Sequence, residues 1–169
     1  MSFVALKHQQ LHPTQTSNLE DWRLEIIAAN NAFIHGQQMR AFAHYHSALA
    51  LANIGIAGLL AGEDAATPEE VERQIAAMVV TRHNLADLFQ QAEKSNEAAE
   101  HLCVAHEALF QLMHHKSADV RALAQRHTNV THRELAQFIK SHGCNLRIQQ
   151  SLLLTQFLCE CCRHKFHYH

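Results

Sequence analysis

The chain has 169 residues, 47% hydrophobic and 18% charged, with a net charge of −2 at pH 7. This length suits one domain or three stacked helix pairs. The basic residues are scattered and outnumbered by acids, which argues against a nucleic-acid partner. Five Gly and two Pro are too few for the turns of a many-stranded sheet, so the composition favours helices.

Neither a secretory leader nor a membrane span is expected. Residues 1–15 lack an early basic region and a long apolar run. The Ala/Gly-rich segment 41–62 is interrupted by polar residues such as His44 and Asn53, so it is a poor membrane span. Five cysteines, three of them within residues 159–162, fit a reducing compartment better than a disulfide framework. We therefore expect a cytoplasmic protein with no membrane partner.

The first helix is predicted to begin at Ser17, because Ser17 and Glu20 have the spacing of a capping box. It should end near residue 35, where Gly36 supplies a left-handed residue. Residues 1–16 have no sustained hydrophobic period and contain a proline, so an irregular N-terminal arm is expected there.

Five further helices are predicted from similar signals. Counted from their capping residues, they cover about 38–60, 67–92, 95–114, 117–142 and 145–162, with Thr67, Ser95, Ser117 and Asn145 as caps and Gly143 ending the fifth. The glycines near the end of the second helix weaken its last turns by roughly 1 kcal/mol each.

The three hairpins share a register. Ala29, Phe33, Gly36, Ala41, Tyr45 and Ala48 correspond to Ala86, Gln90, Glu93, Ala98, Leu102 and Ala105, and to Ala136, Lys140, Gly143, Ile148, Leu152 and Thr155. The pattern is clearest in NNAFIHGQQMRAFAHYHSALALA and resembles the tetratricopeptide repeat, whose units place small residues at close helix crossings. Corresponding residues are about 57 and 50 positions apart, compared with about 34 in the standard repeat, so these units are longer.

The resemblance implies an all-α domain of three stacked antiparallel helix pairs, with about six helices over residues 17–163. A His-rich tail, residues 164–169, follows. A plain antiparallel bundle, in which the alanines only let helices approach, is the alternative architecture.

The last eleven residues, CECCRHKFHYH, carry the densest set of metal-ligating side chains. Cys159 and Cys162 have CxxC spacing, and His164 and His167 follow them. Two thiolates and two imidazoles suit zinc, and soft sulfur ligands equally suit copper(I). These four residues form a candidate metal site, and a terminus without metal is the alternative. The helical scaffold itself requires no cofactor.

Catalytic motifs are absent from the sequence. It contains no G-x-S-x-G elbow, no glycine-rich phosphate loop, and no pair of histidines at i, i+4 with an adjacent glutamate. We therefore expect a non-enzymatic protein. Its sixteen histidines predict that acidification from about pH 7 to 5 changes its behaviour.

A partner-binding face is predicted on the second helix. Phe42 and His46 fall outside the apolar stripe of Ala41, Tyr45 and Ala48. Together with Met39 they either pack on the next pair or bind a partner. The leading hypothesis is an adaptor or scaffold that presents a helical surface to a protein or peptide. The first alternative is a zinc- or copper-binding protein, and the second is a helical bundle that binds a small molecule. Homo-oligomer formation is left open.

Overall fold

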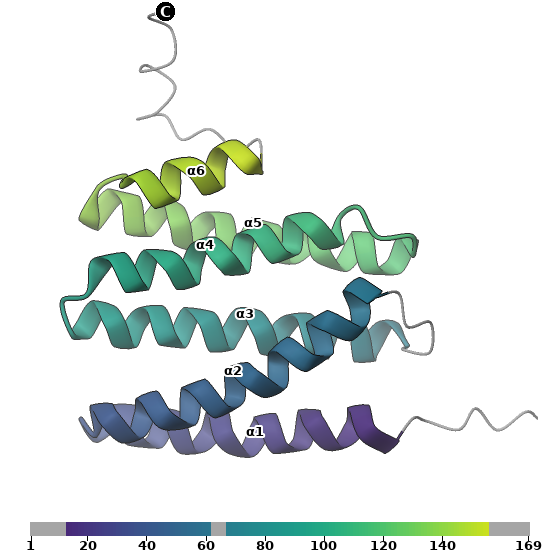
Figure 1. Cartoon of the computed structure of the whole chain (residues 1–169), viewed down its shortest axis with the longest axis horizontal. Helices are drawn as coiled ribbons and strands as arrows, with labels where there is room; N and C mark the ends of the chain where they lie inside the picture. The colour runs from purple at the N-terminus through teal and green to yellow at the C-terminus, as the bar shows by residue number, and fades with distance from the viewer. Residues whose placement is uncertain (1–12, 62–66, 156–169) are drawn as a thin grey trace, which may run out of the picture.

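The structure, a computed structural model, describes residues 13–61 and 67–155 and contains six helices and no strand within them. The helices are α1 (Pro13–Ile34), α2 (Gln38–Ala61), α3 (Pro68–Gln91), α4 (Ser95–Leu112), α5 (Ala118–His142) and α6 (Leu146–Leu154) (Figure 1). The all-α prediction is therefore confirmed. No described helix has the length and hydropathy that crossing a membrane requires.

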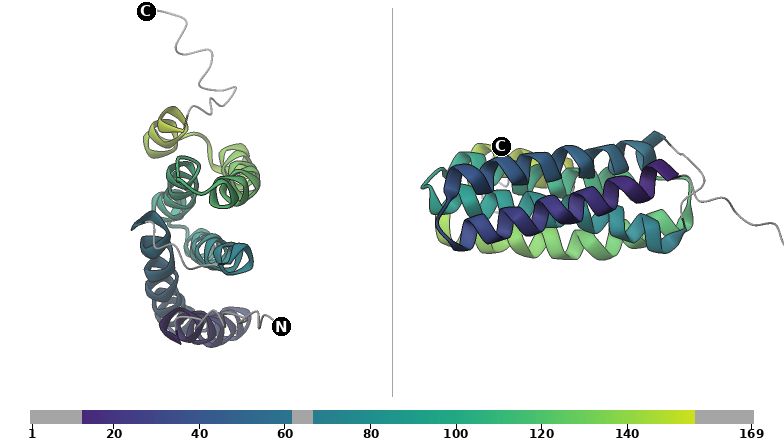
Figure 2. Two further views of the ribbon diagram at one scale, coloured as in Figure 1. Left: turned by 90° about the vertical axis from the view of Figure 1, so that its right-hand side faces the viewer. Right: turned by 90° about the horizontal axis from the view of Figure 1, so that it is seen from below.

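The helices form an open stack of two layers. Seen along the helices, α1, α3 and α5 make one layer and α2, α4 and α6 make the other (Figure 2). Each pair packs on the next through α2 with α3 and α4 with α5, and also within the layers through α1 with α3, α3 with α5 and α4 with α6. Helices α1 and α6 lie at opposite ends, so the three predicted antiparallel pairs are stacked rather than closed into a ring (Figure 1).

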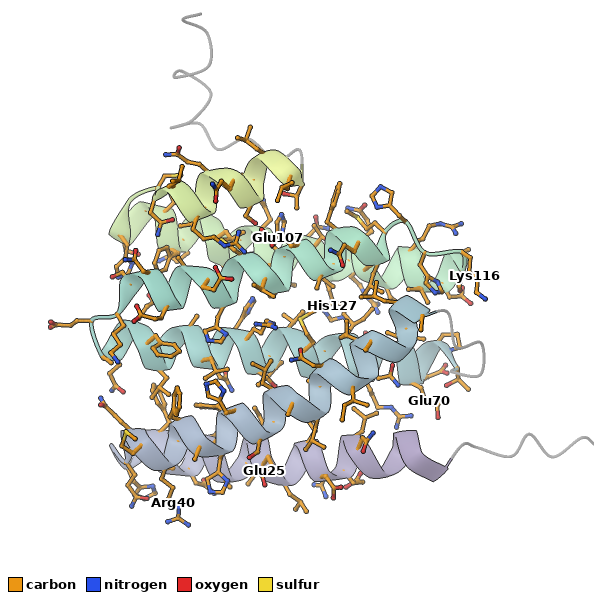
Figure 3. The ribbon with its side chains drawn as sticks, in the orientation of Figure 1. Glu25, Arg40, Glu70, Glu107, Lys116 and His127 are labelled. Carbon is orange, nitrogen blue, oxygen red and sulfur yellow. The ribbon has the colours of Figure 1, made fainter. Side chains whose placement is uncertain are left out.

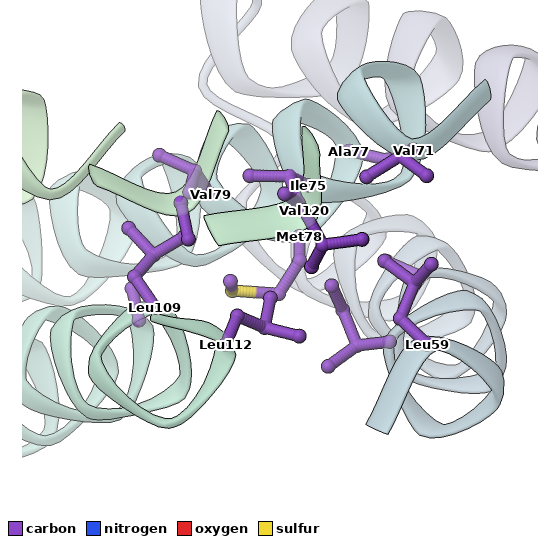
Figure 4. Close-up of a cluster of buried hydrophobic side chains, with 13 residues drawn as sticks. Leu59, Val71, Ile75, Ala77, Met78, Val79, Leu109, Leu112 and Val120 are labelled. Atoms are coloured by element: carbon purple, nitrogen blue, oxygen red, sulfur yellow. The ribbon is translucent and has the colours of Figure 1, made fainter. Parts of the chain in front are cut away.

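The apolar core runs through the stack as three clusters, each shared by at least three helices. The first cluster contains residues of α2, α3, α4 and α5, among them Ile56, Ile75, Leu109 and Val120 (Figure 4). The second joins α1 and α2 to the end of α3, and the third joins α3 and α4 to α5 and α6. No pair covers its own apolar face, so each pair depends on its neighbour for burial.

The turns within the three pairs have left-handed residues at equivalent positions of the register. Gly36 has φ 71°, Glu93 has φ 58° and Gly143 has φ 80°. The N–H groups of Gln37 and Lys94 bond back to the carbonyls five residues earlier, and those of Gly36 and Glu93 bond to the carbonyls three residues earlier. Both turns therefore have the hydrogen bonds of a Schellman motif, one around a glycine and the other around a glutamate.

Three of the predicted helix caps are confirmed. Thr67 and Glu70 form a capping box in which each side chain accepts the other residue's N–H, with Pro68 at the first helical position. Ser117 accepts from the N–H of Val120, and Asn145 caps α6 in the same way. Each cap satisfies an amide that has no partner within the helix.

The predicted start at Ser17 is wrong, because α1 begins at Pro13. Proline at the first helical position loses no hydrogen bond and has its φ already set for a helix. The helical domain therefore begins within the segment 1–16 that was predicted to be an irregular arm. Residues 1–12, 62–66 and 156–169, which include the His-rich tail, lie outside the described residues.

Two other boundaries differ from the prediction. Lys94, rather than Ser95, occupies the N-cap of α4 and makes no capping bond through its side chain. The Schellman turn at Glu93 ends α3 so tightly that the chain enters α4 one residue early. Helix α6 ends at Leu154, and its predicted continuation to Cys162 lies outside the described residues.

A charged clamp holds α6 against α4. Arg147 donates from Nη1 and Nη2 to the two carboxylate oxygens of Glu107, at 2.6 and 3.0 Å, and from Nε to Glu100. Glu107 lies on the side of α4 that faces α6 (Figure 3). The hydrogen bonds to Glu107 are the main reason that the pKa of Arg147 lies above its usual value. Such bidentate pairs of arginine and carboxylate are stronger and more directional than ion pairs with a single hydrogen bond.

Changes of the left-handed residue in two equivalent turns should alter stability in opposite directions. Gly36→Ala should lower the free energy of unfolding by about 1 kcal/mol, because a Cβ is unfavourable at positive φ even though nothing lies within 4 Å of it. Glu93→Gly should raise it by about 0.5–1 kcal/mol for the same reason. Urea denaturation measures both, and a loss of stability in Glu93→Gly would refute this account of the turns.

Removing the clamp should loosen α6 selectively. Arg147→Met should cost about 1–2 kcal/mol, because it keeps the apolar stem but leaves Glu107 without its charged partner. Hydrogen exchange should accelerate at α6 amides and stay unchanged in α1 and α2. Glu100→Gln is the matched control with a smaller effect, since the Glu100 side chain is 52% exposed. Uniform acceleration across the chain would contradict a local role.

Candidate functional site

A row of aromatic rings crosses three helices of the stack. Phe42 of α2 lies 4.2 Å from the ring of His46 and 5.9 Å, edge to face, from the ring of Phe89 on α3. Phe89 in turn stacks on His101 of α4, with ring centroids 5.4 Å apart. We call His46, Phe42, Phe89 and His101 the aromatic row. It joins α2, α3 and α4 through their side chains; His46 is exposed and the other three residues are half-buried.

The aromatic row borders a hollow of about 250 Å³ between α2 and the end of α3. Met39 and Phe42 form one wall, and Leu88, Phe89 and Ala92 form the other, with Gln38 and Lys94 at the edge. Met39 is 81% exposed, whereas Phe42 is half-buried. Of the three residues predicted to bind a partner, Met39 and Phe42 therefore line one hollow, and His46 lies beside it on Phe42.

The sequence did not predict that Phe89 and His101 belong to this surface. Phe89 shares a helix face with the buried residues Leu85 and Ala86, but its ring is only half-buried because it spans the edge between α2 and α4. The contact depends on three helices meeting, and no spacing along the chain encodes it.

Burial controls the charges behind the aromatic row. The pKa of His101 is lowered to about 4, mainly by burial, and the neighbouring Arg82 and His46 act in the same direction. Burial also lowers the pKa of Arg82, an effect that Glu100 opposes. The buried Nε of Arg82 makes no hydrogen bond to the residues that the structure describes. At neutral pH the row therefore contains a neutral His101 backed by a guanidinium.

Other histidines have separate structural roles. His44 bonds through Nδ1 to Glu25 Oε2 at 2.7 Å, between α1 and α2. Glu25 is labelled in Figure 3. His46 instead lies on the ring of Phe42. The two side chains lie on different sides of α2. His106 is fully buried and bonds through Nδ1 to Thr131 Oγ1 at 2.8 Å, and burial lowers its pKa to about 4.

The tentative metal ligands Cys159, Cys162, His164 and His167 all lie outside the described residues. Within residues 13–61 and 67–155, no group of three or more His, Cys, Asp or Glu side chains is placed to hold a metal ion. Cys103 in this part of the chain is buried between α4 and α6, where burial raises the pKa of its thiol to about 11 and makes it unreactive.

Comparison with known proteins gives one family match. The model described as "Protein of unknown function (DUF2753)" matches residues 20–169, which cover the aromatic row and extend through the Cys/His tail. No curated protein matches the chain, and no solved structure matches it either.

Acidification should destabilise the fold. In the unfolded chain His101 and His106 titrate near 6.5, whereas in the folded protein the pKa of each is about 4. Because the unfolded state binds more protons between these values, the free energy of unfolding should fall as the pH drops through this window. For the fully buried His106 the loss is roughly 3 kcal/mol.

Urea denaturation between about pH 7 and 4 measures this effect. His106→Gln should be less stable at neutral pH but should show a shallower pH dependence than the unmodified protein. An unchanged slope in this variant would mean that His106 does not carry the acid sensitivity.

Proposed function

The chain belongs to the DUF2753 family of proteins of unknown function, and we propose that it is a non-enzymatic interaction protein that binds a peptide segment of a protein partner. The binding surface is the hollow at the aromatic row. One observation carries the proposal: an exposed methionine and two half-buried phenylalanines, from two helices, surround a hollow at the surface of the helical stack. Aromatic and methionine side chains are enriched at the centres of protein interfaces.

The size of the hollow favours a side chain as its occupant. At about 250 Å³ it is slightly smaller than the roughly 300–1,000 Å³ of typical small-molecule sites. A single leucine, methionine or phenylalanine side chain from a partner would fill it and be removed from water. Burial of such an anchor is worth about 1.5–3 kcal/mol, which is the scale of an interface hot spot.

The edge of the hollow suggests the chemistry next to the anchor. Lys94 is the ionisable residue among those that line it. We therefore infer that the partner segment carries an acidic residue beside its large apolar side chain. A helix or an extended strand can present such a pair, and Met39 can adapt to either because its side chain is flexible and 81% exposed.

The metal-binding alternative remains a prediction from the sequence. All four of its ligands lie beyond Thr155, the last described residue, and the family match extends over the same residues. The absence of enzymatic activity is likewise a prediction.

A displayed library of random peptides, selected on the full chain, tests the proposal. Selected peptides should share a large apolar residue beside an acidic one. Phe42→Ala and Phe89→Ala should each weaken their binding at least tenfold, because each change removes a wall of the hollow. Lys94→Ala should weaken binding by less and reduce its salt dependence.

Leu24→Ala is the matched control, since Leu24 is 61% exposed on α1, away from the hollow. It should leave peptide affinity unchanged. If the selected peptides bind Phe42→Ala as tightly as the unmodified chain, or if they share no apolar anchor, the proposed surface is wrong.

A further inference from the structure

A second and larger cavity lies at the other end of α2. Helix α2 diverges from α1 toward its C-terminus and crosses toward α3 and α4 (Figure 1). In the space that this leaves, residues of α1, α2 and α3 enclose a cavity of about 510 Å³. This volume falls within the range of small-molecule sites. Its residues are different from those of the hollow at the aromatic row.

The walls of this cavity are uncharged and mainly apolar, with the amides of Asn18 and Gln74 among the lining side chains. Helix α2 contributes Leu51, Ile54, Gly55, Gly58 and Ala61, which recur at helical spacing and so form one stripe. The two glycines contribute no side chain to the wall. No lining residue is ionisable. Charged residues gather instead around a neighbouring hollow of about 270 Å³.

One polar atom in the cavity wall lacks a partner. Gln74 of α3 is only 4% exposed, and its buried Oε1 accepts no hydrogen bond from the residues that the structure describes. A buried acceptor without a donor costs about 1–3 kcal/mol, so such atoms call for a specific explanation. Gly55 permits this placement, because a Cβ on residue 55 would come within 3.2 Å of the Gln74 side chain.

Two side chains of α1 that line the cavity also carry polar groups. Asn18 is only half-buried, and Trp22 has a partner of its own. Trp22 donates from Nε1 to Thr81 Oγ1 at 2.8 Å, and the Thr81 hydroxyl donates to the carbonyl of Ala77. The indole of Trp22 therefore has its donor engaged and offers the cavity an apolar surface. Gln74 is left as the buried polar group in need of a partner.

We propose that this cavity binds a small, neutral, mainly apolar molecule with one hydrogen-bond donor, an alcohol O–H or an amide N–H, which bonds to Gln74 Oε1. The uncharged walls give no compensation for an ionised ligand, whose desolvation would oppose binding. The unpartnered acceptor selects for a donor. This site is independent of the proposed peptide surface, so either can fail without the other.

The sole tryptophan, Trp22, lines the cavity and reports on binding through its fluorescence. Octan-1-ol is the probe, and its methyl ether, 1-methoxyoctane, is the matched molecule without a donor. Octan-1-ol should produce a saturable change in the fluorescence of the full chain. The ether should bind about three- to tenfold more weakly, because it cannot donate to Gln74.

Two variants test separately the hydrogen bond to Gln74 and the binding of the ligand inside the cavity. Gln74→Met should abolish the preference for the alcohol over the ether, because it removes the acceptor but keeps the length of the side chain. Gly58→Leu should fill the cavity and abolish binding of both molecules, while its better helix propensity maintains the thermal unfolding midpoint. Ala50→Leu, an exposed position on the same helix outside the cavity, should bind normally.

The proposal is overturned by any of three results. They are a fluorescence change that does not saturate, an alcohol preference that persists in Gln74→Met, and unchanged affinity in Gly58→Leu.

Discussion

Close packing of helices at fully buried alanines is the constraint on which the rest of the structure depends. Ala29, Ala41, Ala48, Ala86, Ala98 and Ala105 all have no exposed surface and lie at equivalent positions of the first two pairs. A larger side chain at any of them would force neighbouring helices apart and open a core that three or four helices share. The left-handed turn residues fix where each pair folds back, and so bring these alanines opposite one another.

The surfaces with functional interest follow from the same constraint. Aromatic rings do not fit at the alanine crossings, so Phe42 and Phe89 lie at the edge of the stack and form the hollow there. At the other end of α2, glycines replace larger residues, and the helix moves away from α1 to leave the cavity at Gln74. An open stack keeps both regions accessible, whereas a closed bundle would bury its concave faces.

Local signals in the sequence predicted most of the fold. The predictions of helix caps at Thr67 and Ser117 and of helix ends at the glycine turns were correct, because the hydrogen bonds and dihedral angles involved depend on residues a few positions apart. The misplaced starts at Ser17 and Ser95 occurred where a favourable local signal competed with a stronger neighbour, a proline in one case and a Schellman turn in the other. The partner-binding residues were predicted only in part. Phe89, His101 and the unpartnered Gln74 acquire their roles from contacts among three helices, which no local pattern contains.

The distance between the two ends of the stack tests the architecture most directly. Spin labels can be attached to unnatural amino acids at two exposed positions, Leu24 of α1 and Leu153 of α6, which avoids labelling the native cysteines. Double electron–electron resonance spectroscopy then measures the distance between the two labels. Three successive helix contacts, α1 to α3, α3 to α4 and α4 to α6, predict a distance on the order of 25–35 Å. A distance near 10–15 Å, roughly that of adjacent helices, would mean that the helices close into a bundle and would contradict the open stack.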